Sequence, residues 1–526
     1  MSPVLSLCLS LFGLLLLSAP LFLLIGLATT LGYVLFDGAA WSEIAFAESL
    51  RKLTDKPPLL AVPFFVLSGS IMSRGAIAER LVNVARAAFS GMPGGLGVAT
   101  VMACMFFAAI SGSSPVTVIT IGGVMYPALI KAGYGERFST GLVTSAGTLG
   151  ILIPPSIPMI VYAIFASGVQ VIQVEDLFLA GVGPGLLIGL LLTLYCLKDG
   201  LERGERFSAG EGEFVERFIE GFWSLMLPVV ILGGIYSGVF TATEAAAISV
   251  VYSLIVEIWI HRSLKLEDIP SVVGESTVLM GSLLVIFAMA VGLNDLLAEL
   301  ELPEKAVHWI QQQDLTPVTF MLILNGFLLI VGCLMDIMSA IMILVPLLAP
   351  MAAAYGIDPI HLGVVFIVNL ELGYLTPPMG LNLFVSSSLF QKPISEVMRS
   401  VIPFMALLAI ALLLVTYIPT IALGPVRALH GESFYVPFPT GQVSEETTPE
   451  RKGGGGALTI QEMMRMQEAS AGGEEAGAEV EESAQPKPAA RPLTIQEMMR
   501  MQEAMEASDG GSSDGGSEAP EAGEAE

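Results

Sequence analysis

Residues 147–158 read Gly-Thr-Leu-Gly-Ile-Leu-Ile-Pro-Pro-Ser-Ile-Pro and lie within an apolar stretch from about residue 138 to 169. The stretch is long enough to cross a bilayer as a helix. Its prolines remove backbone donors and clash with the preceding turn, so a regular helix cannot continue through them. At membrane depth a broken backbone is tolerated only where it is buried in protein or lines a polar cavity. The sequence therefore predicts an interrupted helix inside a membrane protein.

The composition also indicates a membrane protein. Of the 526 residues, 54% are hydrophobic and 14% are charged, whereas about a quarter of a soluble chain is charged. Apolar stretches of near-membrane length recur from about residue 5 to 423, with short polar gaps. We predict a first span at about residues 3–36, another at about 179–197 and a last one at about 401–423, and residues 76–90 alternate polar and apolar at helical spacing. We therefore predict an all-α polytopic membrane protein.

The net charge of −25 is unevenly distributed along the chain. Residues 431–526 hold 20 of the 49 acidic and 6 of the 24 basic side chains. Much of the acidity therefore belongs to a tail, and nothing in the charge pattern indicates a nucleic-acid partner.

The first half of the membrane region recurs in the second half at an offset of 223 residues. Gly150 falls on Gly373, and the pair Pro154-Pro155 falls on Pro377-Pro378. The other coincidences are Phe64 with Phe287, Gly69 with Gly292, Pro127 with Pro350, and Gly133 with Gly356. Most of these residues fix backbone geometry. We predict two inverted repeats, about 57–197 and 280–425, each with a re-entrant hairpin and a broken helix.

The hairpin tips are predicted at residues 111–115 and 332–336, and the broken helices at 147–158 and 369–380. A broken helix offers free carbonyls where it ends and free amides where it restarts. Carbonyls with hydroxyls suit Na⁺, and amides at a helix start suit an anion. The candidate substrate-binding side chains are Thr144, Ser145, Ser156, Asn369 and Asn382.

Two acidic residues fall within the second set of motifs, and a carboxylate inside a span is costly and usually functional. Asp336 corresponds to Ser113 and Glu371 to Thr148 under the offset. Each could coordinate a cation or belong to a hydrogen-bonded structural cluster, and the tip position of Asp336 favours function. Glu244 starts a span, where an acidic residue offsets the helix dipole.

The sequence fits two other functional classes less well. An intramembrane hydrolase could use Ser111, Ser113 or Ser114 as its nucleophile, but it needs a positioned base, and we place no His or Lys within a span of either half. A channel would suit the hairpins. Two different broken segments per half favour a carrier with one site. A binding-protein-independent anion or cation carrier or channel stays as the alternative.

Several motifs resemble the large, DctM-type membrane subunit of the tripartite ATP-independent periplasmic (TRAP) transporters. In the first half these are residues 63–69, 150–158 and 243–247; in the second they are Met335-Asp336, Pro346, Pro350 and 376–382. The resemblance covers roughly residues 1–427. It implies an elevator-type transporter of the bacterial inner membrane, with a scaffold and a moving transport domain. It also implies Na⁺-coupled import of a C4-dicarboxylate, keto acid or sugar acid, without an organic cofactor.

The resemblance further implies partners and ligands. A periplasmic binding protein would deliver the substrate, and a small DctQ-type membrane subunit would support the scaffold. Membrane lipids would contact the outer surface of the protein. One Na⁺ site would use Ser111, Gly112, Ser113, Gly150, Ile153 and Pro155. The other would use Gly332, Asp336, Gly373, Thr376 and Met379.

The tail, residues 431–526, follows the membrane domain of residues 1–430 and has a composition typical of disorder. The motif Leu-Thr-Ile-Gln-Glu-Met-Met-Arg-Met-Gln-Glu-Ala occurs at 458–469 and again at 493–504. Each copy opens with a capping-box spacing, but twelve residues make only a marginal helix alone. We expect a cytoplasmic tail with two docking segments for an unknown partner, or a passive tail with a duplicated segment.

Overall fold

The computed structural model describes residues 21–36, 51, 56–166, 170–205, 213–313, 315–378 and 380–439. Residues Met1–Thr448 form one compact unit. The predicted docking segments, the first part of the predicted first span and Met379 lie outside the described residues.

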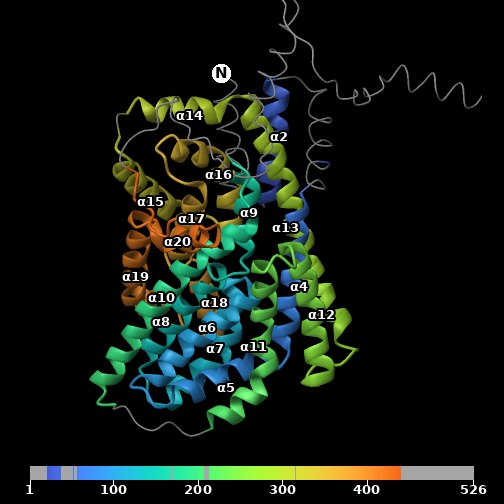
Figure 1. Cartoon of the computed structure of the whole chain (residues 1–526), viewed down its shortest axis with the longest axis vertical. Helices are drawn as coiled ribbons and strands as arrows, with labels where there is room; N and C mark the ends of the chain where they lie inside the picture. The colour runs from blue at the N-terminus through green and yellow to red at the C-terminus, as the bar shows by residue number, and fades with distance from the viewer. Residues whose placement is uncertain are drawn as a thin grey trace, which may run out of the picture. The chain divides into compact units, whose positions relative to one another are not determined.

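Every regular element in the described ranges is a helix, and seven of these helices are long and apolar enough to cross a membrane (Figure 1). This confirms the predicted all-α membrane fold. The helices before the second repeat are α2 (Leu21–Phe36), α4 (Ala61–Arg74), α5 (Ile77–Phe89), α6 (Gly95–Ser111), α7 (Ser114–Lys131), α8 (Glu136–Ala146), α9 (Ile157–Phe165), α10 (Val174–Glu202), α11 (Phe214–Tyr236) and α12 (Ala242–Ile255). Those that follow are α13 (Ile269–Glu299), α14 (Leu302–Gln311), α15 (Pro317–Leu334), α16 (Ile337–Ala353), α17 (Pro359–Gly373), α18 (Leu381–Phe390), α19 (Ile394–Tyr417) and α20 (Thr420–Leu429).

Hydrogen bonds identify two ends of the helix bundle, which we call the α5 end and the α14 end. At the α5 end, the buried Glu257 carboxylate after α12 accepts from the backbone amides of Ala76 and Ile77 at 3.0 Å. Helix α12 ends at the α5 end, so its first residue, Ala242, lies at the opposite, α14 end, where its amide donates to Glu175 near the start of α10 at 3.1 Å. Glu205, just after α10, accepts from the Gly94 amide between α5 and α6 at 2.6 Å. Helix α10 therefore runs from the α14 end to the α5 end, over a length of about 43 Å. Figure 1 shows α5 and α14 far apart at the bottom and top of the bundle.

The two hairpins enter the bundle from opposite ends. Helices α6 and α7 form the first hairpin, and their outer ends lie beside α5 (Figure 1). Helices α15 and α16 form the second hairpin, and the Tyr355 hydroxyl after α16 donates to the Ile310 carbonyl in α14 at 3.0 Å. This is the inverted arrangement that the offset of 223 residues predicted.

Two predicted boundaries are wrong. The span predicted at residues 179–197 is the longer α10, because polar residues continue its last turns through i,i+4 pairs: Lys198 lies 3.6 Å from Glu202, and Asp199 lies 2.9 Å from Arg203. The last span, predicted at 401–423, divides into α19 and α20. Pro419 disfavours helical backbone at the preceding residue, and Ile418 has φ −120° and ψ 79°.

Two smaller predictions can be compared with the helix starts. Thr241 and Glu244 form a capping box at the start of α12, so Glu244 has the structural role that we favoured. Residues 76–90, which alternate polar and apolar at helical spacing, form α5, and its apolar side is buried against α6, α7 and α11.

Candidate ion and substrate site

The first hairpin turns at a tip that exposes backbone oxygens. Helix α6 ends at Ser111, Gly112 adopts a left-handed φ of +59°, and Ser113 is extended before α7 begins. The Thr117 hydroxyl donates to the Ser113 carbonyl at 2.9 Å and lies 3.0 Å from the Ser111 hydroxyl. The tip therefore gathers hydroxyl and carbonyl oxygens from Ser111, Ser113 and Thr117.

The first broken helix is interrupted at the position where its prolines predict a break. Helix α8 ends at Ala146, a 3₁₀ turn covers Gly147–Ile151, and α9 begins only at Ile157. Ser156 caps α9: its hydroxyl oxygen accepts from the Met159 amide at 3.4 Å and its hydroxyl donates to the Ile151 carbonyl. The Pro154–Pro155 and Pro377–Pro378 peptide bonds are both cis.

The first tip packs directly on the first break, with glycine at the closest approach. A Cβ on Gly150 would lie 2.6 Å from the Ser113 carbonyl oxygen and 2.6 Å from the Thr117 hydroxyl. A Cβ on Gly112 would lie 2.7 Å from the Pro155 carbonyl oxygen. The structure thus brings together five of the six predicted ligands of the first Na⁺ site. The sixth, Ile153, is on the same break, but its side chain packs against Gly185 of α10.

The second repeat repeats this contact. A Cβ on Gly373, at the end of α17, would lie 2.7 Å from backbone atoms of Gly332 in the second hairpin. Asp336 is exposed at the tip between α15 and α16. Its carboxylate caps α16 by accepting from the Met338 amide at 3.0 Å and the Ser339 amide at 3.2 Å, and it also accepts from the Ser339 hydroxyl. Asp336 therefore lies at the tip, as predicted, and its carboxylate also caps α16.

Both contacts suit an alkali cation. The first offers neutral oxygens only, and the second adds the Asp336 carboxylate and the Thr376 hydroxyl, which already donates to the Leu372 carbonyl at 2.9 Å. Such oxygen ligands at broken helices are those that Na⁺ prefers. Within the described ranges no three His, Cys, Asp or Glu side chains gather as a metal cluster.

Glu371 lies where the two repeats meet. Its side chain is fully buried, and one carboxylate oxygen lies 2.5 Å from the Thr148 hydroxyl, which also lies 2.7 Å from the Ser145 carbonyl. Thr148 and Glu371 are 223 residues apart, which is the repeat offset. They are therefore equivalent positions of the two repeats, and the pseudo-twofold axis that relates the repeats passes through their contact. The other Glu371 oxygen has no hydrogen-bond partner among the described residues.

Two predicted substrate residues join α18 to the first repeat. The Asn382 side-chain amide donates to the Ser114 hydroxyl at 2.6 Å, and the Thr144 hydroxyl lies 2.7 Å from that of Ser386. All four side chains are buried. Helix α18, which follows the second break, is therefore hydrogen-bonded to the first hairpin through Asn382 and to α8 through Ser386.

The other candidates lie apart or have a local role. Asn369 donates to the carbonyl and side-chain oxygens of Asn325, both at 2.9 Å, and Asn325 donates to Thr416 at 3.0 Å. This network joins α17 to α15 and α19 rather than to the first tip. Ser156 is a helix cap, and the buried Ser145 hydroxyl has no partner in the described part of the chain.

The expectation that no His or Lys lies within a span is wrong. Lys131 ends α7 and Lys198 lies near the end of α10, and both helices are long and apolar enough to span a membrane. His361 lies in the shorter apolar helix α17, where it is buried with Nε2 2.9 Å from the Val415 carbonyl oxygen. The imidazole is thus bonded to a backbone carbonyl of α19 and not to one of the tip serines.

Sequence reasoning missed three polar partners of the site. Thr117 and Ser386 supply hydroxyls to the first tip and to Thr144. The Tyr374 hydroxyl accepts from the Ile337 amide at the second tip, at 3.4 Å. Thr117 stands four residues after Ser113, one helical turn, and this spacing was the available signal. The Thr144–Ser386 pair becomes visible only when the two halves pack together, and the Ile337–Tyr374 pair only when the second tip packs on its own broken helix.

Comparisons with known proteins agree with this geometry. Residues 8–421 match the family described as "Tripartite ATP-independent periplasmic transporter, DctM component". The chain is 41% identical over 401 residues to the C4-dicarboxylate TRAP transporter large permease protein DctM of Pseudomonas aeruginosa, covering 76% of this chain and 92% of that protein. It is 37% identical over 413 residues to the isethionate TRAP transporter permease protein DctMQ of Oleidesulfovibrio alaskensis, covering 76% of this chain and 64% of that protein. Its fold is similar to the crystal structure of the Alcanivorax borkumensis YdaH transporter, with TM-score 0.58, 13% identity, and coverage of 83% of this chain and 100% of that one.

Proposed function

Because the chain belongs to the DctM family of large permease subunits of TRAP transporters, we propose that it imports a small organic acid across the bacterial inner membrane together with Na⁺. The observation that carries the proposal is the pair of tip-and-break contacts, at Gly150 with Ser113 and at Gly332 with Gly373. The family is one of transporters, so the hydrolase alternative is set aside.

The proposed cycle is an elevator. Helices α2, α4, α11, α12 and α13 contact one another in the pairs α2–α13, α4–α12, α4–α13 and α11–α12, which suits a scaffold. The hairpin α6–α7 contacts α8 and α18, which suits a separate transport domain around the ion sites. Na⁺ at each contact would hold a tip against its break and so complete the substrate cavity between them.

The substrate proposal is a C4-dicarboxylate, keto acid or sugar acid, and a C4-dicarboxylate is the first to test. The relative with 41% identity is named for C4-dicarboxylates, whereas the one with 37% identity is named for isethionate. The names of relatives thus differ in substrate. A periplasmic binding protein and a small DctQ-type subunit are the proposed partners, and the name DctMQ supports the pairing of the two membrane subunits.

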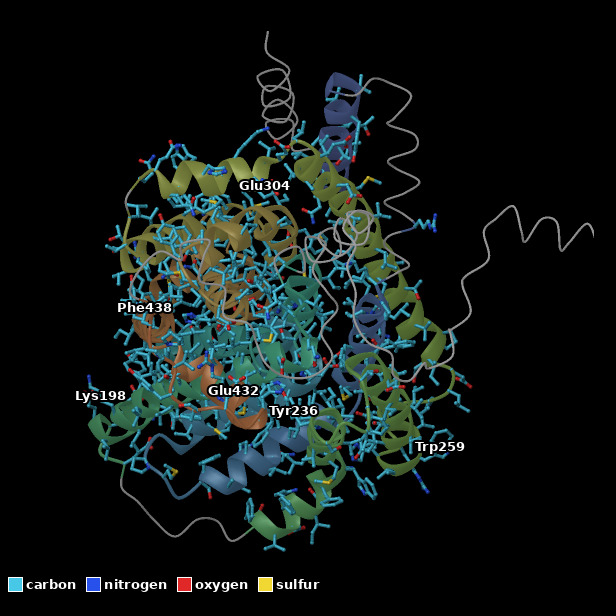
Figure 2. The ribbon with its side chains drawn as sticks, turned by 45° about the horizontal axis from the view of Figure 1, so that its top comes forward. Lys198, Tyr236, Trp259, Glu304, Glu432 and Phe438 are labelled. Atoms are coloured by element: carbon cyan, nitrogen blue, oxygen red, sulfur yellow. The ribbon has the colours of Figure 1, made fainter. Side chains whose placement is uncertain are left out.

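The basic residues support an orientation. Connections at the α5 end carry many of them: Arg80, Arg86, Lys131, Arg137, Lys198, Arg203 and Arg217. At the α14 end, the α11–α12 and α16–α17 connections carry none, and the path from α13 to α15 carries Lys305 in its described residues. Figure 2 shows Lys198 and Glu304 at these two ends. Cytoplasmic connections are enriched in Lys and Arg, so we assign the α5 end to the cytoplasm.

This orientation changes the expected side of the tail. His430, just after α20, lies 2.8 Å from Asp176 at the start of α10, which is the α14 end. The tail would then leave on the periplasmic side instead of the cytoplasmic side. Cysteines placed at Lys198 and Glu304 test this: a membrane-impermeant maleimide added to intact spheroplasts should label only Glu304→Cys, and labelling of only Lys198→Cys would reverse the assignment.

Reconstitution tests the function. The full chain, its small subunit and its binding protein should take up labelled C4-dicarboxylate only under an inward Na⁺ gradient. Uptake that persists without Na⁺ would refute the coupling. Uptake by this chain without a binding protein would favour the alternative carrier or channel.

A further inference from the structure

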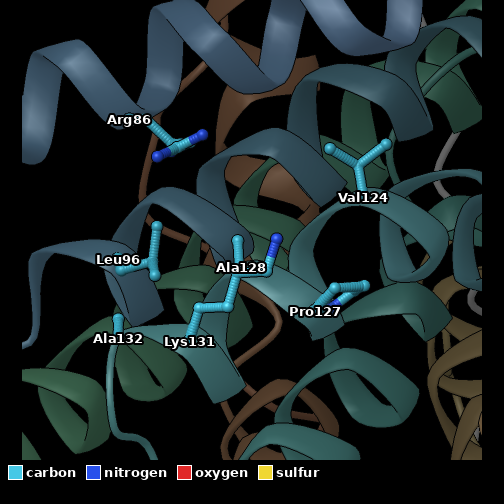
Figure 3. Close-up of a pocket in the computed structure, with 7 residues that line it drawn as sticks. All are labelled: Arg86, Leu96, Val124, Pro127, Ala128, Lys131 and Ala132. Carbon is cyan, nitrogen blue, oxygen red and sulfur yellow. The ribbon is translucent and has the colours of Figure 1, made fainter.

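A basic groove lies outside the ion sites, between α5 and the first hairpin (Figure 3). Its volume is about 470 Å³, and its walls include Arg86 of α5, Leu96 of α6, and Val124, Pro127, Ala128 and Lys131 of α7. Two cationic side chains thus share a space whose other walls are apolar.

Within the described part of the chain, neither Arg86 nor Lys131 forms an ion pair. One nearby acid is Glu205, which lines an adjoining groove of about 270 Å³ together with Arg86. Its carboxylate is already engaged, because it accepts from the Gly94 amide at 2.6 Å and pairs with Arg203 at 3.0 Å. The groove therefore carries uncompensated positive charge.

The groove adjoins a third groove along α7, whose lining is part apolar and part polar. This groove, of about 420 Å³, shares Val124 and extends to Ile119 and Val116, and it also contains Ser73, Glu79 and Thr120. Ile119 is 51% and Val124 36% exposed on a helix that is apolar enough to span the membrane. A ligand that fits both parts has an anionic head and an apolar chain.

The depth of the groove agrees with such a ligand. Lys131 is the last residue of α7, and Val124, Ile119 and Val116 lie progressively further toward the hairpin tip of this helix, which is long and apolar enough to span a membrane. The groove lies at the α5 end, which the basic connections assign to the cytoplasm. Basic pockets between helices on this side are suited to the headgroups of anionic lipids.

We propose that this groove binds an anionic phospholipid. The lipid phosphate lies between Arg86 and Lys131, and one acyl chain lies along Val124 and Ile119. Because Arg86 belongs to α5 and Lys131 to α7, the bound phosphate joins α5 to the first hairpin. A soluble anion would use the two cations but leave the apolar wall of α7 without a partner.

The test measures lipid retention by the full chain. Native mass spectrometry of protein extracted in mild detergent should show retained phosphatidylglycerol or cardiolipin in preference to phosphatidylcholine. The double variant Arg86→Gln/Lys131→Gln should bind phosphatidylglycerol about thirtyfold more weakly, because the loss of each juxtamembrane charge weakens binding about fivefold. The matched control Arg137→Gln/Lys198→Gln removes two charges from the same end outside the groove and should bind as the wild type does.

A second variant and a second ligand make the result decisive. Val124→Trp fills the groove without a change of charge, and it should also lose retained lipid while the protein stays monodisperse. Equal lipid binding by the Arg86/Lys131 double variant, or by Val124→Trp, would overturn the proposal. So would inorganic phosphate that raises the unfolding temperature as much as phosphatidylglycerol does, because the groove would then take a soluble anion.

Discussion

Two glycines set the distance between each tip and its break. Ala at Gly150 or Gly373 would place Cβ at 2.6 Å and 2.7 Å from backbone atoms that cannot turn away. We expect each substitution to destabilise the fold by about 1–3 kcal/mol through overpacking and to reduce Na⁺-driven uptake. Gly123→Ala in α7 is the matched control, since nothing lies within 4 Å of its Cβ. Uptake and unfolding should be measured together, and full activity of Gly150→Ala would disprove the tight contact.

One substitution separates the helix-capping role of Asp336 from its proposed role as a Na⁺ ligand. Asn is as good a helix cap as Asp, so Asp336→Asn should keep the stability of α16 while it removes the charge. We expect the apparent Na⁺ affinity in uptake to weaken by at least about tenfold, with little change in unfolding. Asp358→Asn is the control, because Asp358 caps α17 by accepting from the Ile360 amide at 2.8 Å. An unchanged Na⁺ dependence in Asp336→Asn would remove Asp336 from the site.

Single residues were predictable to the extent that they act on the backbone. Both breaks were located by the prolines at 154–155 and 377–378. The glycines at 150 and 373 marked the position of closest approach on each break. The partners of Asn369 and Asn382 were not predictable. Each bond joins residues at least 44 positions apart, so no local pattern marks it.

At the scale of elements, α18 is held to the first repeat by buried side-chain bonds. The Asn382–Ser114 bond of 2.6 Å should show a coupling energy of about 0.5–1.5 kcal/mol in a double-mutant cycle with Asn382→Leu and Ser114→Ala. The free energy of unfolding of the full chain provides the measurement. Ser276→Ala in α13 serves as the distant partner and should be additive with Asn382→Leu. Additivity of Asn382→Leu with Ser114→Ala would show that the bond contributes nothing.

The periodicity of the sequence predicted the number and type of elements better than their ends. Helix α10 exceeds its apolar core because charged i,i+4 pairs extend it. The boundary between α19 and α20 could have been predicted from Pro419, because a proline disfavours helical backbone at the residue before it, here Ile418. The apolar composition of residues 401–423 predicts one span only when the effect of Pro419 on its neighbour is left out.

At the scale of the molecule, the membrane unit extends past the end of the last helix. The Val436 amide and carbonyl both bond the Thr420 hydroxyl at 3.0 Å, and the Phe438 ring lies 5.6 Å from that of Tyr417. Deletion of residues 441–526 should therefore leave uptake and stability unchanged. Deletion of 431–526 should lower the unfolding temperature, because it also removes these contacts. Equal stability of the two truncations would contradict this role, and uptake lost in the shorter deletion would make the tail part of the transport machinery.

The inverted pair of tips and breaks is the centre of the account, and Na⁺ binding tests it most directly. The unfolding temperature of the purified full chain should rise with NaCl and saturate, while KCl and choline chloride at equal ionic strength should leave it unchanged. The rise should shrink in Gly150→Ala and Gly373→Ala and persist in Gly123→Ala. An equal rise with choline chloride, or wild-type Na⁺ titrations in both glycine variants, would contradict the assignment of Na⁺ to these two contacts.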